Sequence, residues 1–240
     1  MLNEVDQKYY RAELKYICGE ALLLELEQRL KPLMKADAHG DVDNCYSVHS
    51  LYFDDYRDSC YFDNDIGTNR RYKYRIRYYN DDAEHLRLEQ KEKRNGLCHK
   101  NACPITREQY FQLCDRYGME AFWESNDTLL RRFCIDKAKK LFTPKVIVSY
   151  ERRAYVLYDG NIRITFDRNI SVSDEIDRFL AGDFQRRPVH PKGTHLLEIK
   201  YDNYLPEYVK AALPAMGFVQ TAFSKYNAGR RTMNAMRRKI

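Results

Sequence analysis

The stretch Arg70–Asn80 reads RRYKYRIRYYN and carries a cation at every second position. The basic and the aromatic or aliphatic residues alternate, with Lys73, Arg75 and Arg77 set against Tyr74, Ile76 and Tyr78. Strict alternation is typical of a β-strand, because successive side chains point to opposite faces. One face of this strand therefore presents ammonium and guanidinium groups, which bind phosphate oxygens well.

Other predicted strands repeat this arrangement of one charged and one apolar face. Their charged faces carry Glu13 with Lys15, Glu89 with Lys91, Arg163 with Asp167, and Glu198 with Lys200, while Arg152 is in phase with Tyr150. One such strand is typical of a solvated sheet face. Several together are harder to explain in that way, because like charges directly opposite on neighbouring strands repel each other. A polyanion between the strands would remove this repulsion.

The elements that would position these residues are mostly strands. We expect strands at Tyr9–Cys18, Tyr46–Phe53, Arg70–Tyr79, Leu86–Lys93, Leu97–Ile105, Pro144–Leu157, Asn161–Arg168 and Thr194–Tyr201. We expect helices at Glu20–Leu33, Asn126–Leu141, Ser173–Leu180, Pro206–Met216 and Ser224–Lys239, a short helix or turn at Tyr56–Asp65, and a helix starting at Thr106, with Gln109 as its capping-box partner. Asn95-Gly96 and Asp159-Gly160 predict tight hairpin turns.

This order of elements predicts an α+β fold, in which an antiparallel sheet closes into a barrel with helices packed outside. The charged faces would point inward and the apolar faces outward, under the helices. Such an interior must be hydrated or filled by a ligand, because isolated buried charges are very costly. No linker interrupts the chain, so residues 1–240 are expected to form a single domain.

A chain of phosphates is the ligand that best suits cations converging from several strands. The few carboxylates on the same faces, Glu13, Glu89 and Glu198, could bind a hard divalent cation that bridges phosphate oxygens. The sequence has no P-loop and no G-x-G-x-x-G motif. A nucleotide would therefore not be bound by a glycine-rich loop.

An ordered set of motifs resembles the VTC domain, the catalytic domain of the vacuolar transporter chaperone polyphosphate polymerases. That domain is part of the triphosphate tunnel metalloenzyme, or CYTH-like, superfamily. The motifs are ELKY at Glu13–Tyr16, SLYFDD at Ser50–Asp55, KYRIRYYN at Lys73–Asn80, LEQKEK at Leu88–Lys93, YERRAY at Tyr150–Tyr155, NIRITFDR at Asn161–Arg168, LLEIKYD at Leu196–Asp202 and FSKYNAG at Phe223–Gly229. They cover nearly the whole chain.

The resemblance implies a tunnel of eight antiparallel strands with a basic interior. The catalytic phosphate ligands that it implies are Lys15, Arg75, Arg77, Lys91, Arg152, Arg163, Lys200 and Lys225. Glu13, Lys73, Glu89, Lys100 and Tyr150 are expected to bind substrate, and Glu198 to bind Mn²⁺ or Mg²⁺. The implied reaction transfers the terminal phosphoryl group of ATP to a growing polyphosphate chain.

One departure from the superfamily pattern lies on the first strand. Its hydrolytic members carry E-x-E-x-K there, whereas this sequence reads Arg11-Ala-Glu13-Leu-Lys15. Replacing a carboxylate by a guanidinium favours binding of a long anion over activation of water on a second metal ion. The membrane helices and phosphate-sensing domain of the eukaryotic complexes do not occur in this sequence, so a membrane-associated partner would be encoded elsewhere.

Three other functions remain open from the sequence. The same ligands would suit a hydrolase of tripolyphosphate or nucleoside triphosphates, or a polyphosphate-binding module without catalytic activity. Binding of single-stranded RNA is disfavoured, since the alternation places the tyrosines on the face opposite the cations.

Bulk properties agree with a phosphate ligand without requiring one. The formal net charge is +6, from 41 basic and 35 acidic residues among 240. No apolar run is long enough to cross a bilayer and the N-terminus lacks the apolar core of a signal peptide. With seven scattered cysteines, these features predict a cytoplasmic protein with reduced thiols.

Overall fold

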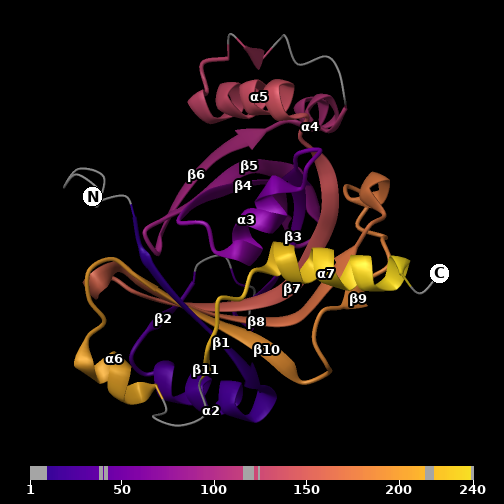
Figure 1. The fold of residues 1–240 in the computed structure, drawn as a ribbon. Coiled ribbons are helices and arrows are strands. Elements are labelled where there is room, and N and C mark those ends of the chain that lie inside the picture. The colour runs from indigo at the N-terminus through magenta and orange to yellow at the C-terminus, as the bar shows by residue number, and fades with distance from the viewer. Residues whose placement is uncertain are drawn as a thin grey trace.

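A computed structural model describes most of the chain (Figure 1). The described residues are 10–37, 40, 43–115, 122–123, 125–213 and 219–238. The strands are β1 (Ala12–Gly19), β2 (Lys35–Ala36), β3 (Cys45–Asp54), β4 (Arg70–Tyr79), β5 (Asp82–Arg94), β6 (Leu97–Ile105), β7 (Thr143–Leu157), β8 (Ile162–Ser173), β9 (Arg187–Pro188), β10 (Thr194–Tyr201) and β11 (Val219–Gln220). The helices are α2 (Glu20–Leu30), α3 (Ser59–Ile66), α4 (Arg107–Cys114), α5 (Thr128–Lys140), α6 (Glu207–Ala212) and α7 (Lys225–Arg237).

The strands form one curled sheet, and the antiparallel α+β class is confirmed. Its main path runs β11-β1-β10-β8-β7-β3-β4-β5-β6, with β2 and β9 beside it, which makes eleven strands among the described residues. Three of these strands, β2, β9 and β11, are only two residues long. The remaining eight build the strongly curved wall that is visible in Figure 1.

The expected closed barrel of eight strands differs from this sheet. In the described part of the chain, β1 and β6 are joined by one bridge rather than by a continuous ladder. The bridge consists of two backbone hydrogen bonds between Arg11 and Cys98, 2.9 and 3.0 Å long. β1 begins at the residue after the bridge and runs on beside β10. The alternation of side chains predicted the curvature and the faces, but it carried no information about which edges would pair.

Local sequence signals explain several of the element boundaries. Asn95 and Gly96 both have positive φ, at 51° and 81°, as the tight turn between β5 and β6 requires. The capping box at α4 is confirmed, because Thr106 Oγ1 accepts from the Gln109 backbone N–H and the Gln109 side chain accepts from the Thr106 N–H. Asp127 caps α5 by accepting from two backbone N–H groups.

Some helices are shorter than the sequence predicts. The segment Ser173–Leu180 contains a single 3₁₀ turn at Ile176–Arg178, and its first residue, Ser173, is the last residue of β8. α6 ends at Ala212, and residues 214–216 of the expected helix lie outside the described residues, as do Tyr9 and Lys239 at the ends of two other predictions. No described helix has the length and apolar character needed to cross a membrane.

Helices cover both faces of the sheet. α4 and α5 lie beside β5 and β6, and α2 lies beside β1 and β10 with α6 next to it, on the side where the expectation placed them (Figure 1). α7 differs, because it packs on the inner face of β7 and β8. A Cβ added to Gly229 of α7 would lie 2.9 Å from Val172 and 3.5 Å from Val148. Val148 points to the same face of β7 as Arg152, so α7 fills one end of the concave side.

Candidate functional site

The concave face of the sheet encloses a cavity of about 750 Å³. Thirteen basic side chains of the described residues line it: Arg11, Lys15, Arg71, Lys73, Arg75, Arg77, Lys91, Lys93, Lys100, Arg152, Arg163, Lys200 and Lys225. Three carboxylates, Glu13, Glu198 and Asp202, line it with them. The cavity therefore carries a large excess of positive charge, which a bound anion would neutralise.

The structure brings nearly all the predicted site residues to this one cavity. Every residue that the sequence proposed as a catalytic ligand lines it, and so do Glu13, Lys73, Lys100, Tyr150 and Glu198. Glu89 is the exception. It is 1% exposed and does not belong to the cavity lining, but it pairs with Arg75 and Lys100, which do. Glu89 is therefore a buried counterion, and the expectation that it contacts substrate directly finds no support in its position.

Like charges face each other across three neighbouring strands. Lys73 of β4 lies directly opposite Lys91 of β5, which lies directly opposite Lys100 of β6. Such a row costs free energy in an ordinary sheet, because the ammonium groups repel each other. Carboxylates relieve part of this repulsion: Lys91 donates to Glu13 at 2.7 Å, and Lys100 lies 3.4 Å from Glu89.

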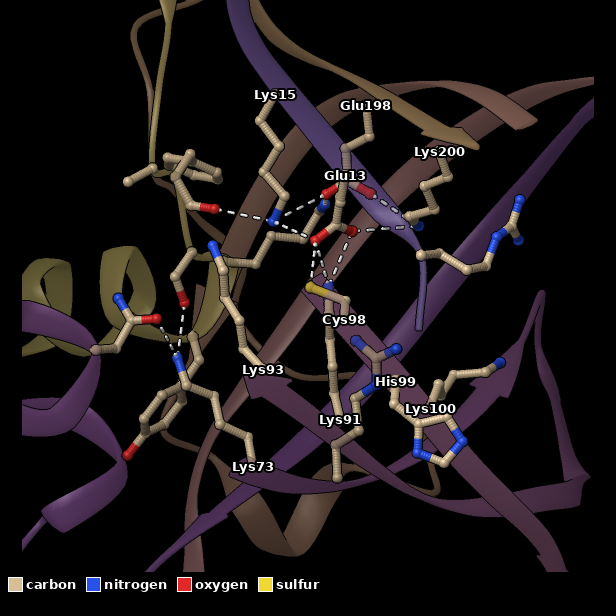
Figure 2. Close-up of a pocket in the computed structure, with 18 of the residues that line it drawn as sticks. Glu13, Lys15, Lys73, Lys91, Lys93, Cys98, His99, Lys100, Glu198 and Lys200 are labelled. Atoms are coloured by element: carbon tan, nitrogen blue, oxygen red, sulfur yellow. Dashed lines mark hydrogen bonds and ion pairs between the residues drawn. The ribbon is translucent and has the colours of Figure 1, made fainter. Parts of the chain in front are cut away.

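Glu13 and Glu198 lie at the centre of a lysine cluster on β1 and β10 (Figure 2). Lys15 and Lys200 each contact both carboxylates, at distances between 3.2 and 3.7 Å. Burial disfavours the charge on Glu198, but Lys225, Lys200 and the neighbouring cations outweigh it and hold the pKa of Glu198 well below its usual value. Burial also lowers the pKa of Lys200 to about 8, although both carboxylates oppose the change.

A second ion cluster joins β7, β8 and the start of α7. Arg152 binds Asp167 through two hydrogen bonds of 2.6 and 2.8 Å, and Lys225 lies 2.6 Å from the same carboxylate. Asp167 is fully buried, and Arg152 and Lys225 hold its pKa below the usual value against the effect of burial. The ring of Tyr150 lies beneath both cations, 5.1 Å from the guanidinium of Arg152 and 4.8 Å from the ammonium of Lys225.

The guanidinium groups of Arg75 and Arg77 form the third cluster. Arg75 donates to Glu89 at 2.6 to 2.8 Å and to the hydroxyl of Tyr52 at 2.9 Å. Arg77 is 4% exposed and donates to the hydroxyls of Tyr79 and Tyr150 at 3.2 and 3.3 Å. These contacts fix both side chains in the cavity wall, so little conformational entropy remains to be lost when they bind an anion.

Two further arginines line the cavity, each paired with a carboxylate. Arg163 forms an ion pair with Asp37 and donates to the hydroxyl of Tyr46. Arg11 lies 2.7 Å from Asp202, so the residue that replaces the first carboxylate of the hydrolytic pattern is itself part of the cavity lining.

Sequence reasoning missed several residues of the site. Asp167 shares a strand face with Arg163, so the alternation already contained a signal for it. Tyr52 and Asp54 lie in the SLYFDD motif, which had no assigned role. Asp54 is fully buried and accepts from the backbone N–H groups of Cys60 and Tyr61, at 2.9 and 3.0 Å, so it fixes the start of α3. Ser224 and Asn227 lie in the FSKYNAG motif and Asn64 in the predicted turn at Tyr56–Asp65, but none of the three had an assigned role.

Glu13 and Glu198 are the residues best suited to a divalent cation. Their carboxylate oxygens are the donors that Mg²⁺ and Mn²⁺ prefer, and shared contacts with Lys15 and Lys200 place them close together. The described residues contain no cluster of three or more potential metal ligands. The pair fits a metal whose remaining ligands are phosphate oxygens and water, which is how Mg²⁺ is usually bound beside phosphates.

Comparison with solved structures returned distant similarities. The PH1819 protein from Pyrococcus horikoshii OT3 shares 15% sequence identity over 85% of this chain and 84% of its own, with a TM-score of 0.45. A second protein of that organism, PH1012, shares 13% over 85% of each chain, with a TM-score of 0.42. A conserved hypothetical protein from Pyrococcus furiosus shares 13% over 85% of each chain, with a TM-score of 0.41.

Comparisons with curated proteins and with family models gave different outcomes. No curated protein matched the sequence. The model of the VTC domain matches residues 10–234, a range that contains every residue of the cavity described above. Because the match extends over almost the whole chain of 240 residues, the protein belongs to the VTC domain family.

Proposed function

We propose that this protein is a metal-dependent polyphosphate polymerase, which transfers the terminal phosphoryl group of ATP to a growing polyphosphate chain. The observation that carries the proposal is the cavity that, among the described residues, thirteen basic side chains line together with three carboxylates. A chain of phosphates supplies negative charge at regular intervals along its length, so it would match cations contributed by several strands. Membership in the VTC domain family supports a ligand of this class.

Phosphoryl transfer requires positioning and stabilisation of charge more than it requires a protein nucleophile. Arg75 and Arg77 would bind equatorial oxygens of the transferred group, since their planar guanidinium groups are held rigidly and can donate two hydrogen bonds each. Lys15, Lys200 and Lys225 would neutralise the neighbouring phosphates. Mn²⁺ or Mg²⁺, bound by Glu198 with Glu13 beside it, would supply further charge neutralisation at the terminal phosphates.

The first strand favours synthesis over hydrolysis. Arg11 forms an ion pair with Asp202 and occupies the position of a carboxylate in the hydrolytic pattern. The site then offers two carboxylates close together rather than three, which suits one metal ion better than two. A hydrolase of tripolyphosphate or nucleoside triphosphates remains the second candidate, because the same phosphate ligands would serve it.

Analysis of the products by phosphorus NMR would separate these activities. Incubation of the protein with ATP and Mn²⁺ should give the signal of internal phosphates of a long chain, together with ADP. Release of orthophosphate alone would identify a hydrolase, and tight polyphosphate binding without turnover under any metal would identify a binding module. The Arg75→Ala and Glu198→Ala variants should both lose the product signal.

The buried tyrosines argue against RNA as a ligand. Tyr74 and Tyr78 are 0% and 1% exposed and lie on the face of β4 opposite the cations. Stacking of bases on these rings would require the outer layer of the protein to open. A single-stranded RNA should therefore fail to displace labelled polyphosphate at matched charge.

We further propose a cytoplasmic location, with any membrane-associated partner encoded elsewhere.

A further inference from the structure

Lys73 makes contacts unlike those of the other buried cations in the cavity. Its ammonium group donates to Asn64 Oδ1 at 3.0 Å, to Ser224 Oγ at 2.9 Å and to Asn227 Oδ1 at 2.9 Å. All three acceptors are neutral, and no carboxylate of the described residues forms an ion pair with it. An ammonium group has three N–H donors, so these acceptors match the protonated form completely.

Two of these acceptors belong to the start of α7. Ser224 is the N-cap residue of that helix and accepts from the backbone N–H of Asn227. Between them lies Lys225, whose ammonium group contacts Glu198 and Asp167. Lys73 therefore connects β4 to the turn that presents Lys225 to the cavity, across about 150 residues of sequence.

Two other contacts attach the same turn to residues outside the cavity lining. The hydroxyl of Tyr226 donates to the buried carboxylate of Asp54, and the amide of Asn227 donates to the carbonyl of Tyr61 at 2.9 Å. These contacts involve no residue that lines the cavity other than Tyr226. Lys73 thus anchors this turn from the cavity side, where Lys15 also donates to the carbonyl of Phe223, at 3.0 Å. In Figure 2 the ammonium group of Lys73 lies apart from the cluster around Glu13.

We propose that Lys73 is a positioning residue, which fixes the first turn of α7 and thereby places Lys225 opposite Glu198. The inference rests on the proposed function, because a phosphate chain in the cavity is the anion that would act on Lys73. A bound anion favours the protonated form of Lys73, and the protonated form makes all three bonds. Chain binding would therefore tighten the turn that carries Lys225.

The charges around Lys73 agree with such a linkage. The titratable and aromatic groups that face it are Lys15 of β1, Arg71 of its own strand, Lys91 of β5, Cys60 of α3 and the ring of Tyr226 of α7, 5.0 Å away. Burial is the main cause that lowers the pKa of Lys73, to about 7, with a further contribution from the three cations. Because this pKa lies near neutrality, Lys73 can take up a proton when an anion enters the cavity.

Amide hydrogen exchange in α7 tests this role without any substrate. The amides of residues 227–231 should lose protection by about tenfold in Lys73→Met, which removes hydrogen bonds from a charged donor. Lys73→Arg, which keeps the charge, should restore most of the protection. Lys93→Met is the matched control, because it removes another lysine of the same cavity that forms no hydrogen bond or ion pair with the described residues of α7. Wild-type protection in Lys73→Met, or an equal loss in Lys93→Met, would overturn the proposal.

A second variant keeps the proposal testable if Lys73→Met does not fold. Asn64→Asp replaces the amide beside Lys73 by a carboxylate of nearly the same shape, which raises the pKa of Lys73. The protection of α7 should therefore persist to higher pH than in the wild type. An unchanged pH dependence in this variant would contradict the role of the ammonium group. Addition of tripolyphosphate should increase protection in the wild type and less in Lys73→Met. If tripolyphosphate fails to bind the wild type, the proposed function is wrong, while the exchange data without ligand still report on Lys73.

Discussion

The ammonium group of Lys225 lies 2.8 Å from the carboxylate of Glu198. This contact joins the first residue of the C-terminal helix to β10, and Glu198 is also the residue that best suits a metal ion. The pair therefore connects the placement of a helix to the electrostatics of the candidate site. Both side chains are buried, with 7% and 4% of their surfaces exposed, so their interaction is weakly screened by solvent.

Replacing Glu198 by Gln should separate catalysis from binding. The variant keeps the side-chain shape but removes the charge that a metal ion requires, so turnover of ATP should fall by about 100-fold or more. Binding of tripolyphosphate without metal should not weaken, since the cavity loses a negative charge. Calorimetry and an assay of ADP release would measure the two effects. The control is Glu151→Gln, an exposed residue that accepts from Asn169, and turnover equal to this control would contradict a metal-binding role.

Glu89→Gln should lower stability more than it changes chemistry. Glu89 is buried and neutralises Arg75, so its loss leaves a largely buried guanidinium without a counterion. The free energy of unfolding should fall by about 3 kcal/mol. Urea unfolding would measure this change, and added tripolyphosphate should recover part of it by supplying negative charge. Glu84→Gln, which removes an exposed ion pair with Arg107, should change stability by less than about 1 kcal/mol.

The affinity for tripolyphosphate should decrease as the pH rises above about 7. Burial and the neighbouring cations place the pKa of Lys73 at about 7 in the free protein, and a bound polyanion raises it. At a pH between the pKa of Lys73 in the free protein and its pKa in the complex, the complex holds more protons than the free protein and ligand do. Binding therefore takes up protons, and the affinity decreases as the pH increases. Titration calorimetry at pH 8 in two buffers of different ionisation enthalpy would detect the uptake. A Lys73→Met variant with undiminished proton uptake would show that another group is responsible.

Arg75→Lys should weaken binding although the charge is conserved. The guanidinium of Arg75 donates to Glu89 and to Tyr52 at once, and an ammonium group cannot reproduce that planar geometry. We expect the affinity for tripolyphosphate to fall by about tenfold. Arg107→Lys, at the surface, provides the matched control. Equal affinity of the Arg75→Lys variant and the wild type would mean that Arg75 acts as a simple point charge.

The faces of the strands were predictable because alternation is a local property of extended backbone. The sequence of β4 alone predicted that Arg75 and Arg77 share a face, and the structure places both in the cavity wall. The same reasoning placed Tyr74 and Tyr78 on the opposite, buried face. Capping and turn signals, such as those at Thr106 and Asn95, were also readable, since they involve neighbours only a few residues apart.

The sequence by itself thus determined which residues are cationic, which of them share a strand face, and that the resulting surface suits a polyanion. Only the tertiary structure decided which partner each charge meets. Glu89 is a buried counterion of Arg75. In the described part of the chain, the two edges of the sheet are joined by one bridge, between Arg11 and Cys98. α7 lies on the concave side, where Ser224 is 2.9 Å from the ammonium group of Lys73. These contacts join residues far apart along the chain, and a pattern of period two states which way a side chain points but not what lies opposite it.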